Sequence, residues 1–181
     1  MGNKLDIQYR LLHLEDIDIT FLTGFNRLQE TTRVWYVEDK KFKLKDDHFI
    51  DEWNEDKKRK VIHSLLECLH AGGSVIGAFL HNKLVGFANV ENEFFGMSKQ
   101  YIELPYIHVS REFRKQGIGK GLFSKCCEAA KKMGAQKLYI AAHPSIETQH
   151  FYRDLGCIPA IEMNEKIVQK EPLDIQLEFI L

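Results

Sequence analysis

Apolar residues recur at helical spacing in four stretches of the chain. The clearest are residues 55–69 and 118–133, where an apolar stripe runs beside charged positions. Shorter helices are predicted over Asp16 to about Thr32 and over residues 145–156. The polar and aromatic residues 26–41 are interpreted as the end of the first helix and a following loop.

Other stretches have the alternation or the short apolar runs of β-strands. Two apolar runs flank His81-Asn82-Lys83, which predicts a β-hairpin over residues 74–93. Residues 173–181 place every second side chain on one apolar face. Pro105 interrupts the strand predicted over residues 100–110 and implies a bulge or a sheet edge, because proline cannot donate to a ladder. The remaining strands are predicted at residues 8–14, at 137–143 and, with a weaker pattern, at 157–163.

The order of these elements, β-α-α-β-β-β-α-β-α-β-β, predicts one mixed α/β domain over residues 1–181. A chain of 181 residues suffices for one sizeable core and is short for two. The net charge of −1 provides no global basic field that would draw the protein onto nucleic acid or an anionic membrane. Any affinity for anions must therefore be local.

The cysteines and the start of the chain bear on its location. Cys68, Cys126, Cys127 and Cys157 lack CxxC spacing, which argues against a zinc site or a disulfide framework and favours small buried residues in a reducing compartment. The first residues lack the basic-then-apolar layout of a signal peptide. No apolar run approaches the ~20 residues of a membrane span. We therefore expect a cytoplasmic protein without a metal site.

Three glycines alternate in "FRKQGIGKGLF", residues 113–123, directly before the predicted helix. A P-loop would need GxxxxGK followed by Ser or Thr, which is absent. A dinucleotide fingerprint would have glycine where Leu122 stands, and would follow its strand directly. The pattern Arg-x-x-Gly-x-Gly, at Arg114, Gly117 and Gly119, suits a pyrophosphate cradle of backbone N–H groups. Taken alone, it also fits a glycine-rich helix start with solvated lysines.

The surrounding segment, "YIHVSREFRKQGIGKGLFSKCCEAAKKMGAQKLYIAAHPSIETQHFYRDLGC", resembles the acetyl-CoA-binding core of the GNAT acyltransferase superfamily. It has the same strand, RxxGxG loop, amphipathic helix, second strand, and helix ending in Phe-Tyr-x-x-x-Gly. The resemblance implies a mixed, mostly antiparallel sheet of about seven strands flanked by about four helices. It also implies N-acetyltransferase activity, with acetyl-CoA as co-substrate and a primary amine of a small molecule or a protein as acceptor. The acceptor-side half would extend over about 1–100 and the cofactor-binding core over about 101–160.

The resemblance also assigns roles to positions. The strand around His108 would pair with pantetheine, and the N–H of Val109 would reach the thioester carbonyl. Tyr152 stands at the family's frequent general-acid position, Ser145 replaces a common Asn, and Cys157 replaces a usual Phe. The cofactor-binding residues expected on this basis are Ile107, His108, Val109, Arg114, Lys115, Gln116, Gly117, Ile118, Gly119, Lys120, Ser145 and Tyr152.

The implied reaction needs a proton acceptor for the amine and a proton donor for the CoA thiolate. A tyrosine with a pKa of about 10 suits the donor, which favours Tyr152. Glu103 is the first choice of base, since strand parity aligns it with Ile107 unless the Pro105 bulge reverses it. His143, His108, a water-mediated base and an acceptor that arrives neutral are the alternatives.

Aromatic and acidic residues are mixed in the first half of the chain and could hold an amine cation; otherwise they are core and solvated surface. They are Trp35, Tyr36, Trp53, Glu91, Glu93, Phe94 and Phe95. With Glu91 and Glu93 as first contacts, we expect a compact acceptor such as a polyamine, an amino sugar or an amino acid derivative, and a homodimer as one form of assembly. A non-catalytic CoA-binding module and a nucleotide-dependent oxidoreductase are the alternative functions.

Overall fold

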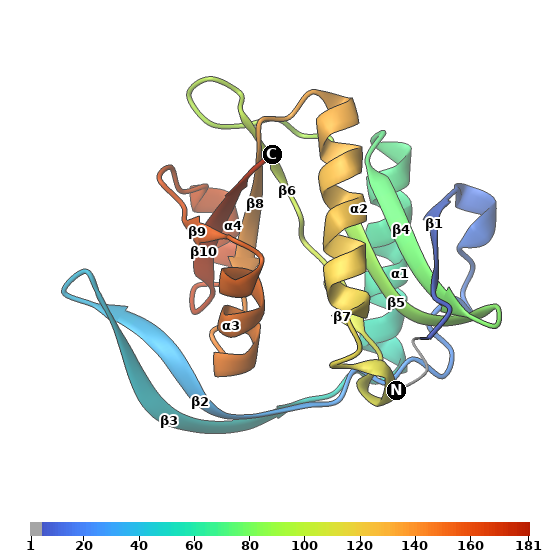
Figure 1. The fold of residues 1–181 in the computed structure, drawn as a ribbon, viewed down its shortest axis with the longest axis horizontal. Helices are drawn as coiled ribbons and strands as arrows, with labels where there is room; N and C mark the ends of the chain where they lie inside the picture. The colour runs from blue at the N-terminus through green and yellow to red at the C-terminus, as the bar shows by residue number, and fades with distance from the viewer. Residues whose placement is uncertain (1–4) are drawn as a thin grey trace.

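Two four-stranded β-sheets diverge from one another in the computed structural model, which describes residues 5–181 (Figure 1). The first sheet is antiparallel and has the order β1 (Gln8–Leu12), β4 (Ser74–Leu80), β5 (Lys83–Val90), β7 (Ile107–Val109). The second has the order β6 (Tyr101–Glu103), β8 (Lys137–Ala142), β10 (Ile175–Ile180), β9 (Ile158–Pro159), with β6 and β8 parallel. The mixed α/β class is confirmed. Residues 1–4, on which part of the signal-peptide prediction rests, lie outside the described range.

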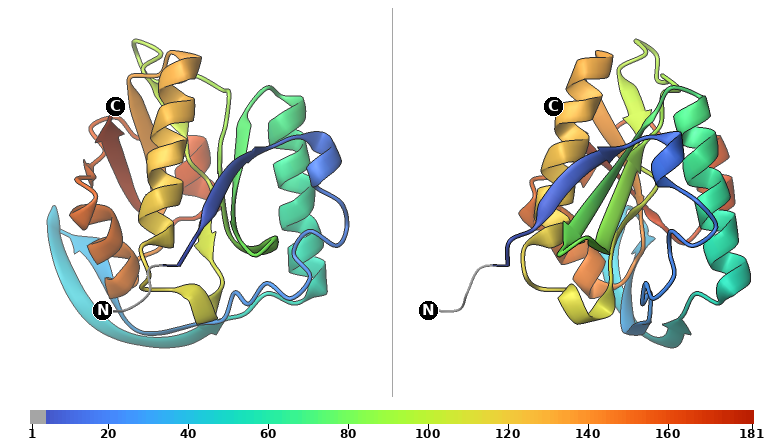
Figure 2. Two further views of the ribbon diagram at one scale, coloured as in Figure 1. Left: turned by 45° about the vertical axis from the view of Figure 1, so that its right-hand side comes forward. Right: turned by 90° about the vertical axis from the view of Figure 1, so that its right-hand side faces the viewer.

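Two long helices cover opposite faces of the first sheet, α1 (Glu55–His70) on one side and α2 (Ile118–Met133) on the other (Figure 2). Strands β4 and β5 are therefore buried on both faces and read as nearly continuous apolar runs. Short helices α3 (Ile146–Asp154) and α4 (Glu165–Lys170) pack against the second sheet. The helices predicted at residues 55–69, 118–133 and 145–156 are confirmed within two residues.

The chain changes sheets at Pro105. Before it, Leu104 N donates to Tyr139 O at 2.9 Å and continues the pairing of β6 with β8. After it, Tyr106 O accepts from Asn89 N at 3.1 Å, and β7 pairs with β5 instead. The bulge or edge predicted from the proline is thus the point where the two sheets separate.

The predicted helix from Asp16 to Thr32 is wrong. Only a short 3₁₀ turn, η1 (Leu14–Asp16), forms there, followed by turns. The carboxylate of Asp18 accepts from the backbone N–H of Thr20 at 2.8 Å, and this local bond competes with a helix. Gly24 then adopts φ +74°, which no right-handed helix accommodates.

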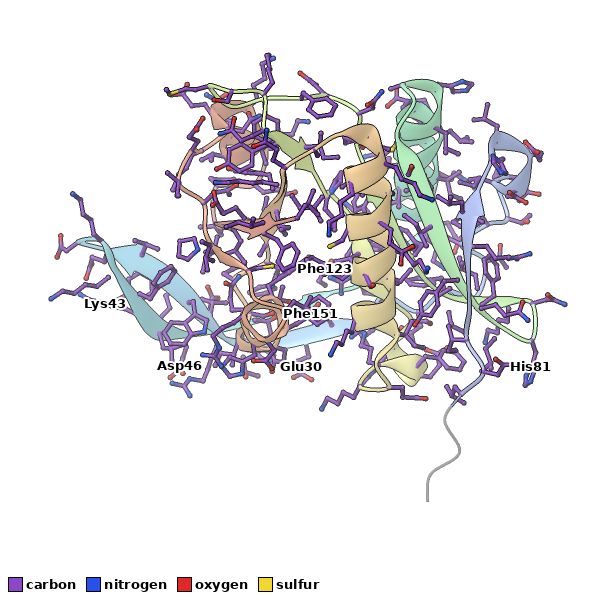
Figure 3. The ribbon with its side chains drawn as sticks, turned by 45° about the horizontal axis from the view of Figure 1, so that its top comes forward. Glu30, Lys43, Asp46, His81, Phe123 and Phe151 are labelled. Carbon is purple, nitrogen blue, oxygen red and sulfur yellow. The ribbon has the colours of Figure 1, made fainter. Side chains whose placement is uncertain are left out.

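A long hairpin of β2 (Gln29–Glu38) and β3 (Lys41–Asp51) replaces the predicted loop. Asp39 and Lys40 form its turn at φ 53° and 60°. The hairpin extends from the body beneath α3, with Lys43 near its free end (Figures 1 and 3). The outer half of β2 is held to the loop between β8 and α3, because Trp35 N donates to Pro144 O at 2.8 Å.

The segment after α3 also differs from the prediction. The weak strand expected over residues 157–163 is reduced to the two residues of β9. Helix α4 was not predicted, although Asn164 caps it by accepting from the backbone of Lys166 at 3.1 Å and of Ile167 at 3.4 Å. The last strand is confirmed as β10.

Candidate active site

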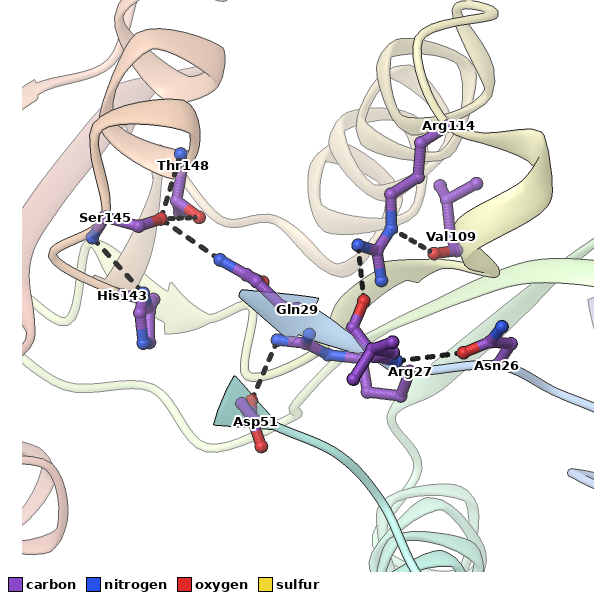
Figure 4. A network of polar contacts seen from close by, with 10 residues as sticks. Asn26, Arg27, Gln29, Asp51, Val109, Arg114, His143, Ser145 and Thr148 are labelled. Carbon is purple, nitrogen blue, oxygen red and sulfur yellow. Dashed lines mark hydrogen bonds and ion pairs between the residues drawn. The ribbon is translucent and has the colours of Figure 1, made fainter. Parts of the chain in front are cut away.

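A cleft of about 530 Å³ opens where the sheets diverge. Strand β7 and the loop leading into α2 form one wall, α3 forms the facing wall, and residues 27–30 cross between them (Figure 4). All the cofactor residues expected from the sequence line this cleft except Gln116 and Ser145. The cleft therefore brings together segments that lie far apart in the chain.

The outer edge of β7 offers free backbone groups to this cleft. His108 pairs with Phe87, and the flanking bonds from Asn89 N to Tyr106 O and from Ser110 N to Val85 O continue the same ladder. In an antiparallel ladder the intervening residues point their N–H groups away from the partner strand. The N–H groups of the intervening residues of β7 therefore face away from β5, toward the cleft.

The first turn of α2 lies at the mouth of the cleft and could hold an anion. Gly117, the N-cap residue, adopts φ +81° and provides no side-chain cap, so the first amides of the helix keep their donors. Lys115 is also left-handed, at φ 60°. The exposed side chains of Lys115 and Lys120 lie along the same mouth. Backbone N–H groups, the helix dipole and two mobile cations thus converge there.

Gly119 and Gly121 allow close packing and are not needed for a left-handed backbone conformation. A Cβ on Gly121 would lie 2.1 Å from the hydroxyl oxygen of Tyr9 in β1, so Tyr9 or the helix would have to shift to accommodate it. A Cβ on Gly119 would lie 3.1 Å from the ring of Phe151, where α2 approaches α3. Figure 3 shows Phe151 on α3 facing α2. Gly121 is therefore explained by strand packing.

The guanidinium of Arg114 is directed into the protein. Its Nε donates to Val109 O at 3.0 Å and its Nη1 donates to Leu28 O at 2.8 Å (Figure 4). Partial burial lowers the pKa of Arg114. This side chain ties the segment before β2 to the end of β7. Gln116, outside the cleft lining, is placed to donate to Glu112 O at 3.4 Å.

Tyr152 faces the cleft from α3 and is 5% exposed. Its ring packs edge-on against Phe123 of α2, with centroids 6.4 Å apart, and against Phe151 at 5.1 Å. Burial raises the pKa of Tyr152 well above its usual value, so its phenol stays protonated. A protonated hydroxyl at this position can donate a proton or a hydrogen bond.

Ser145 is fully buried and its hydroxyl is engaged within the protein. The oxygen accepts from Gln29 Nε2 at 3.2 Å and from Thr148 N at 3.3 Å, and the hydroxyl donates to Thr148 Oγ1 at 2.9 Å. His143 Nδ1 accepts from Ser145 N at 3.2 Å. Burial lowers the pKa of His143, which is therefore neutral. This network joins β2 to the start of α3 (Figure 4).

The three candidate bases have different surroundings. Glu103 lies outside the cleft lining, and burial followed by the charge of Glu91 raises its pKa to about 7. His108 lines the cleft, and its ring lies 4.8 Å from Trp53. Burial lowers the pKa of His108 well below its usual range, and nearby cations lower it further. Glu103 thus has the pKa closest to neutral pH among these three groups.

The acidic residues chosen from the sequence for the acceptor are not part of the cleft lining. Glu91 accepts a hydrogen bond from Asn89 Nδ2 at 2.9 Å, and its pKa is raised by burial. The charges of Glu93 and Lys170 shift the pKa of Glu91, and all three charges shift the pKa of Glu103. These four groups therefore lie close to one another. Residues 27–30 line the cleft instead. The sequence did not identify them as part of the site, because they were predicted to lie in a helix.

The remaining predictions concern a membrane span, a metal site and the state of the cysteines. Within residues 5–181, no helix is both long and apolar enough to cross a membrane. In the same range, no group of three or more His, Cys, Asp or Glu side chains is arranged to hold a metal ion. The four cysteines are unpaired, and Cys127 is the partly exposed one among them.

Solved structures with the same fold cover nearly the whole chain. A nourseothricin acetyltransferase is 16% identical over 96% of this chain and 98% of its own, with a TM-score of 0.67. A putative streptothricin acetyltransferase from Bacillus anthracis str. Ames, in complex with acetyl coenzyme A, is 13% identical over 98% and 99%, with a TM-score of 0.71. The PaiA N-acetyltransferase from Thermoplasma acidophilum, in complex with coenzyme A, is 16% identical over 98% and 100%, with a TM-score of 0.61. At these identities the likeness establishes the fold.

Sequence comparison gives the family. No curated protein sequence matches the chain. The family model of the acetyltransferase (GNAT) family matches residues 30–157, which include β7, the glycine loop, α2 and α3. This match excludes the nucleotide-dependent oxidoreductase considered from the glycine pattern. The chain belongs to the acetyltransferase (GNAT) family.

Proposed function

We propose that the protein transfers the acetyl group of acetyl-CoA to a primary amine of a small molecule. The observation that carries this proposal is the cleft itself. It places the free edge of β7, the uncapped start of α2 and the protonated hydroxyl of Tyr152 around one space. The four unpaired cysteines are consistent with a cytoplasmic location.

The residues present fit acetyl-CoA. The free amides of Ile107 and Val109 would bind the pantetheine arm in the manner of an added strand. The first-turn amides of α2, with Lys115 and Lys120, would neutralise the pyrophosphate. Ser145 has its hydroxyl engaged, so we assign it the positioning of α3 and β2. Arg114 has the corresponding role at β7.

The chemistry needs two proton transfers. Acetyl-CoA supplies a thioester; a carbon–nitrogen bond forms to the amine, and the carbon–sulfur bond breaks. Burial keeps the phenol of Tyr152 protonated, so its hydroxyl would be available to donate a hydrogen bond or a proton to the thiolate as negative charge develops on the sulfur. Glu103, with a pKa of about 7, takes the amine proton through water, since its side chain lies outside the cleft lining. The N–H of Val109 would stabilise the charge on the carbonyl oxygen.

Release of free thiol from acetyl-CoA, measured with a panel of small amines, tests the proposal. Wild type should release thiol in an amine-dependent manner, with acetylated amine as the product. Tyr152→Phe should bind CoA with unchanged affinity and turn over far more slowly. Tight CoA binding without turnover on any amine would favour the alternative, a non-catalytic CoA-binding module.

A further inference from the structure

Arg27 has two buried donors that the proposed function leaves unexplained. Its side chain is 7% exposed and lines the cleft just before β2 begins. Its Nη2 lies 3.2 Å from Asp51 Oδ2, whereas its Nε and Nη1 are buried without a hydrogen-bond partner (Figure 4). Of the side chains described, only Arg27 and Thr31 contain buried polar atoms left unpaired in this way. A buried charged donor is costly to leave unpaired, which makes these two donors candidates for binding a ligand oxygen.

The backbone on both sides of Arg27 is fixed against the end of β7. Asn26 N donates to Ser110 Oγ at 3.0 Å, and Leu28 O accepts from Arg114 Nη1 at 2.8 Å. Arg27 is therefore held beside the strand end that offers its free amide to the thioester. Because we assign the amide of Val109 to the thioester carbonyl, a group bound by Arg27 would lie close to that end of β7.

The side chain of Arg27 points toward the aromatic residues around His108. Its guanidinium carbon lies 5.8 Å from the ring centre of Trp53, and Trp53 meets the ring of His108 edge-on at 4.8 Å. The rings help to hold the guanidinium of Arg27 in place, and a guanidinium is suited to bind a planar carboxylate. Arg27 and His108 line the cleft, and Trp53 lies directly behind them.

The local charge favours an anion in this place. Asp51 is the carboxylate paired with Arg27. The cleft lining also contains two carboxylates, Glu30 and Glu147, but four further cations outnumber them: Arg111, Arg114, Lys115 and Lys120. The charges of Arg27, Arg114 and Lys57 all act to lower the pKa of His108, after the larger effect of burial. A positive neighbourhood also lowers the pKa of an amine placed there, which favours the neutral nucleophile.

We propose that the acceptor is an amine that also carries a carboxylate, and that Arg27 binds this carboxylate in the cleft. The inference rests on the proposed acetyl transfer and names its substrate class. A carboxylate oxygen would supply an acceptor for one of the two unpaired donors, and Arg is the side chain best suited to such a partner. In an amino acid the amine lies within a few bonds of the carboxylate, which would bring it to the thioester beside β7.

Matched pairs of acceptors provide the test. Thiol release from acetyl-CoA is measured with the free amino acids and with their carboxamides, which keep the amine and lose the negative charge. The full-length protein is compared with Arg27→Gln and with Arg33→Gln, an arginine of β2 that is 52% exposed and paired with Asp46. We expect wild type and Arg33→Gln to favour at least one free acid over its amide by tenfold or more in kcat/KM. Arg27→Gln should lose about 10²-fold on the acid and stay within threefold on the amide.

Two further measurements decide between the explanations of a negative result. Calorimetric titration with CoA reports folding and cofactor binding for each variant. Thermal unfolding of the CoA-loaded protein with each amino acid reports acceptor binding without turnover. An equal loss on acid and amide, or wild type that prefers amides, overturns the role of Arg27. That role is also overturned if CoA binds and no amino acid raises the unfolding temperature by at least 2 °C. Failure to bind CoA would instead overturn the proposed function.

Discussion

Replacing Arg114 by alanine separates two roles that the glycine loop could give this side chain. From the sequence, its charge is expected to meet the pyrophosphate. In the structure, its Nε and Nη1 donate to Val109 O at 3.0 Å and Leu28 O at 2.8 Å. The bonds predict that Arg114→Ala acts mainly on stability, by releasing the segment before β2 from the end of β7.

The magnitude follows from these bonds. A hydrogen bond to a charged group contributes about 1.5–3 kcal/mol, so two contribute roughly 3–6 kcal/mol. An arginine regains up to about 2 kcal/mol of rotamer entropy when it is released. Arg114→Ala should therefore lower the free energy of unfolding by about 1–4 kcal/mol, toward the lower end because the side chain is only half-buried.

Urea unfolding of the protein without ligand measures this change, and calorimetric titration with CoA at two salt concentrations measures binding. Lys115→Ala and Lys120→Ala are the matched controls, since both side chains are exposed at the mouth of the cleft. They should leave stability within about 0.5 kcal/mol of wild type. They should also weaken CoA binding and reduce its dependence on salt.

The reverse pattern would refute this reasoning. If Arg114→Ala unfolds like wild type but binds CoA as weakly and with as little salt dependence as the lysine variants, its guanidinium contacts phosphate. The bonds to Val109 O and Leu28 O would then contribute nothing measurable.

Three further predictions concern separate parts of the molecule. Tyr152→Phe should lower kcat by about 10²–10⁴-fold, the usual contribution of general acid catalysis, with CoA affinity within threefold of wild type in calorimetry. Glu103 has a pKa raised from 4.5 to about 7, so the folded state holds its proton where the unfolded state has lost it, and stability falls as pH rises across that window. Glu103→Gln should therefore raise the unfolding free energy at pH 8, by on the order of 1–3 kcal/mol, and not at pH 4. Asp174→Asn is the comparison variant, because the pKa of that carboxyl is also raised to about 7. If Glu103→Gln left the pH dependence of stability unchanged, the pKa shift of Glu103 would be contradicted. Gly121→Ala should lower the free energy of unfolding in urea by about 1–3 kcal/mol, because its Cβ would meet the Tyr9 hydroxyl at 2.1 Å. Adding Tyr9→Ala should recover part of this loss, whereas strictly additive effects of the two substitutions would exclude the contact.

Elements with one dominant periodicity were predictable from the sequence. Helix α2 has an apolar stripe and ends at Gly134, which adopts φ 91° at the C-cap, so pattern and cap agree. The hairpin of β4 and β5 turns at His81 and Asn82, as its two apolar runs predicted. Pro105 marked the break between β6 and β7, although the pattern alone could not tell that the chain also changes sheets there.

The β2–β3 hairpin was missed because its strands carry mixed signals. Thr31 and Val34 are the buried positions of β2, and two exposed residues, Thr32 and Arg33, separate them instead of the single residue of strict alternation. Its turn, Asp39-Lys40, lacks the glycine that usually marks a two-residue hairpin. β-Branched and aromatic residues from Thr31 to Val37 were the available signal, and they favour a strand over the end of a helix.

The candidate site was predictable to the extent that its residues lie in one continuous motif. The sequence expectation and the cleft agree on β7 and the glycine loop, where local pattern and backbone geometry coincide. The bonding of Arg114 and Ser145 could not be predicted from the chain, because their partners, Leu28 and Gln29, come from a segment more than 80 residues earlier. Such pairings depend on tertiary contact rather than on spacing.

The segment over residues 27–30 connects the two walls of the cleft. Arg114 holds Leu28 on the side of β7, and Ser145 holds Gln29 on the side of α3. These bonds place Arg27 between the walls that would bind acetyl-CoA, at the start of a hairpin that belongs to neither of them. If Arg27 binds the acceptor as we propose, the glycine loop and β7 would serve the cofactor, and the segment before the hairpin would select the acceptor. On this proposal, the residues that identify the family are separate from those that choose its substrate.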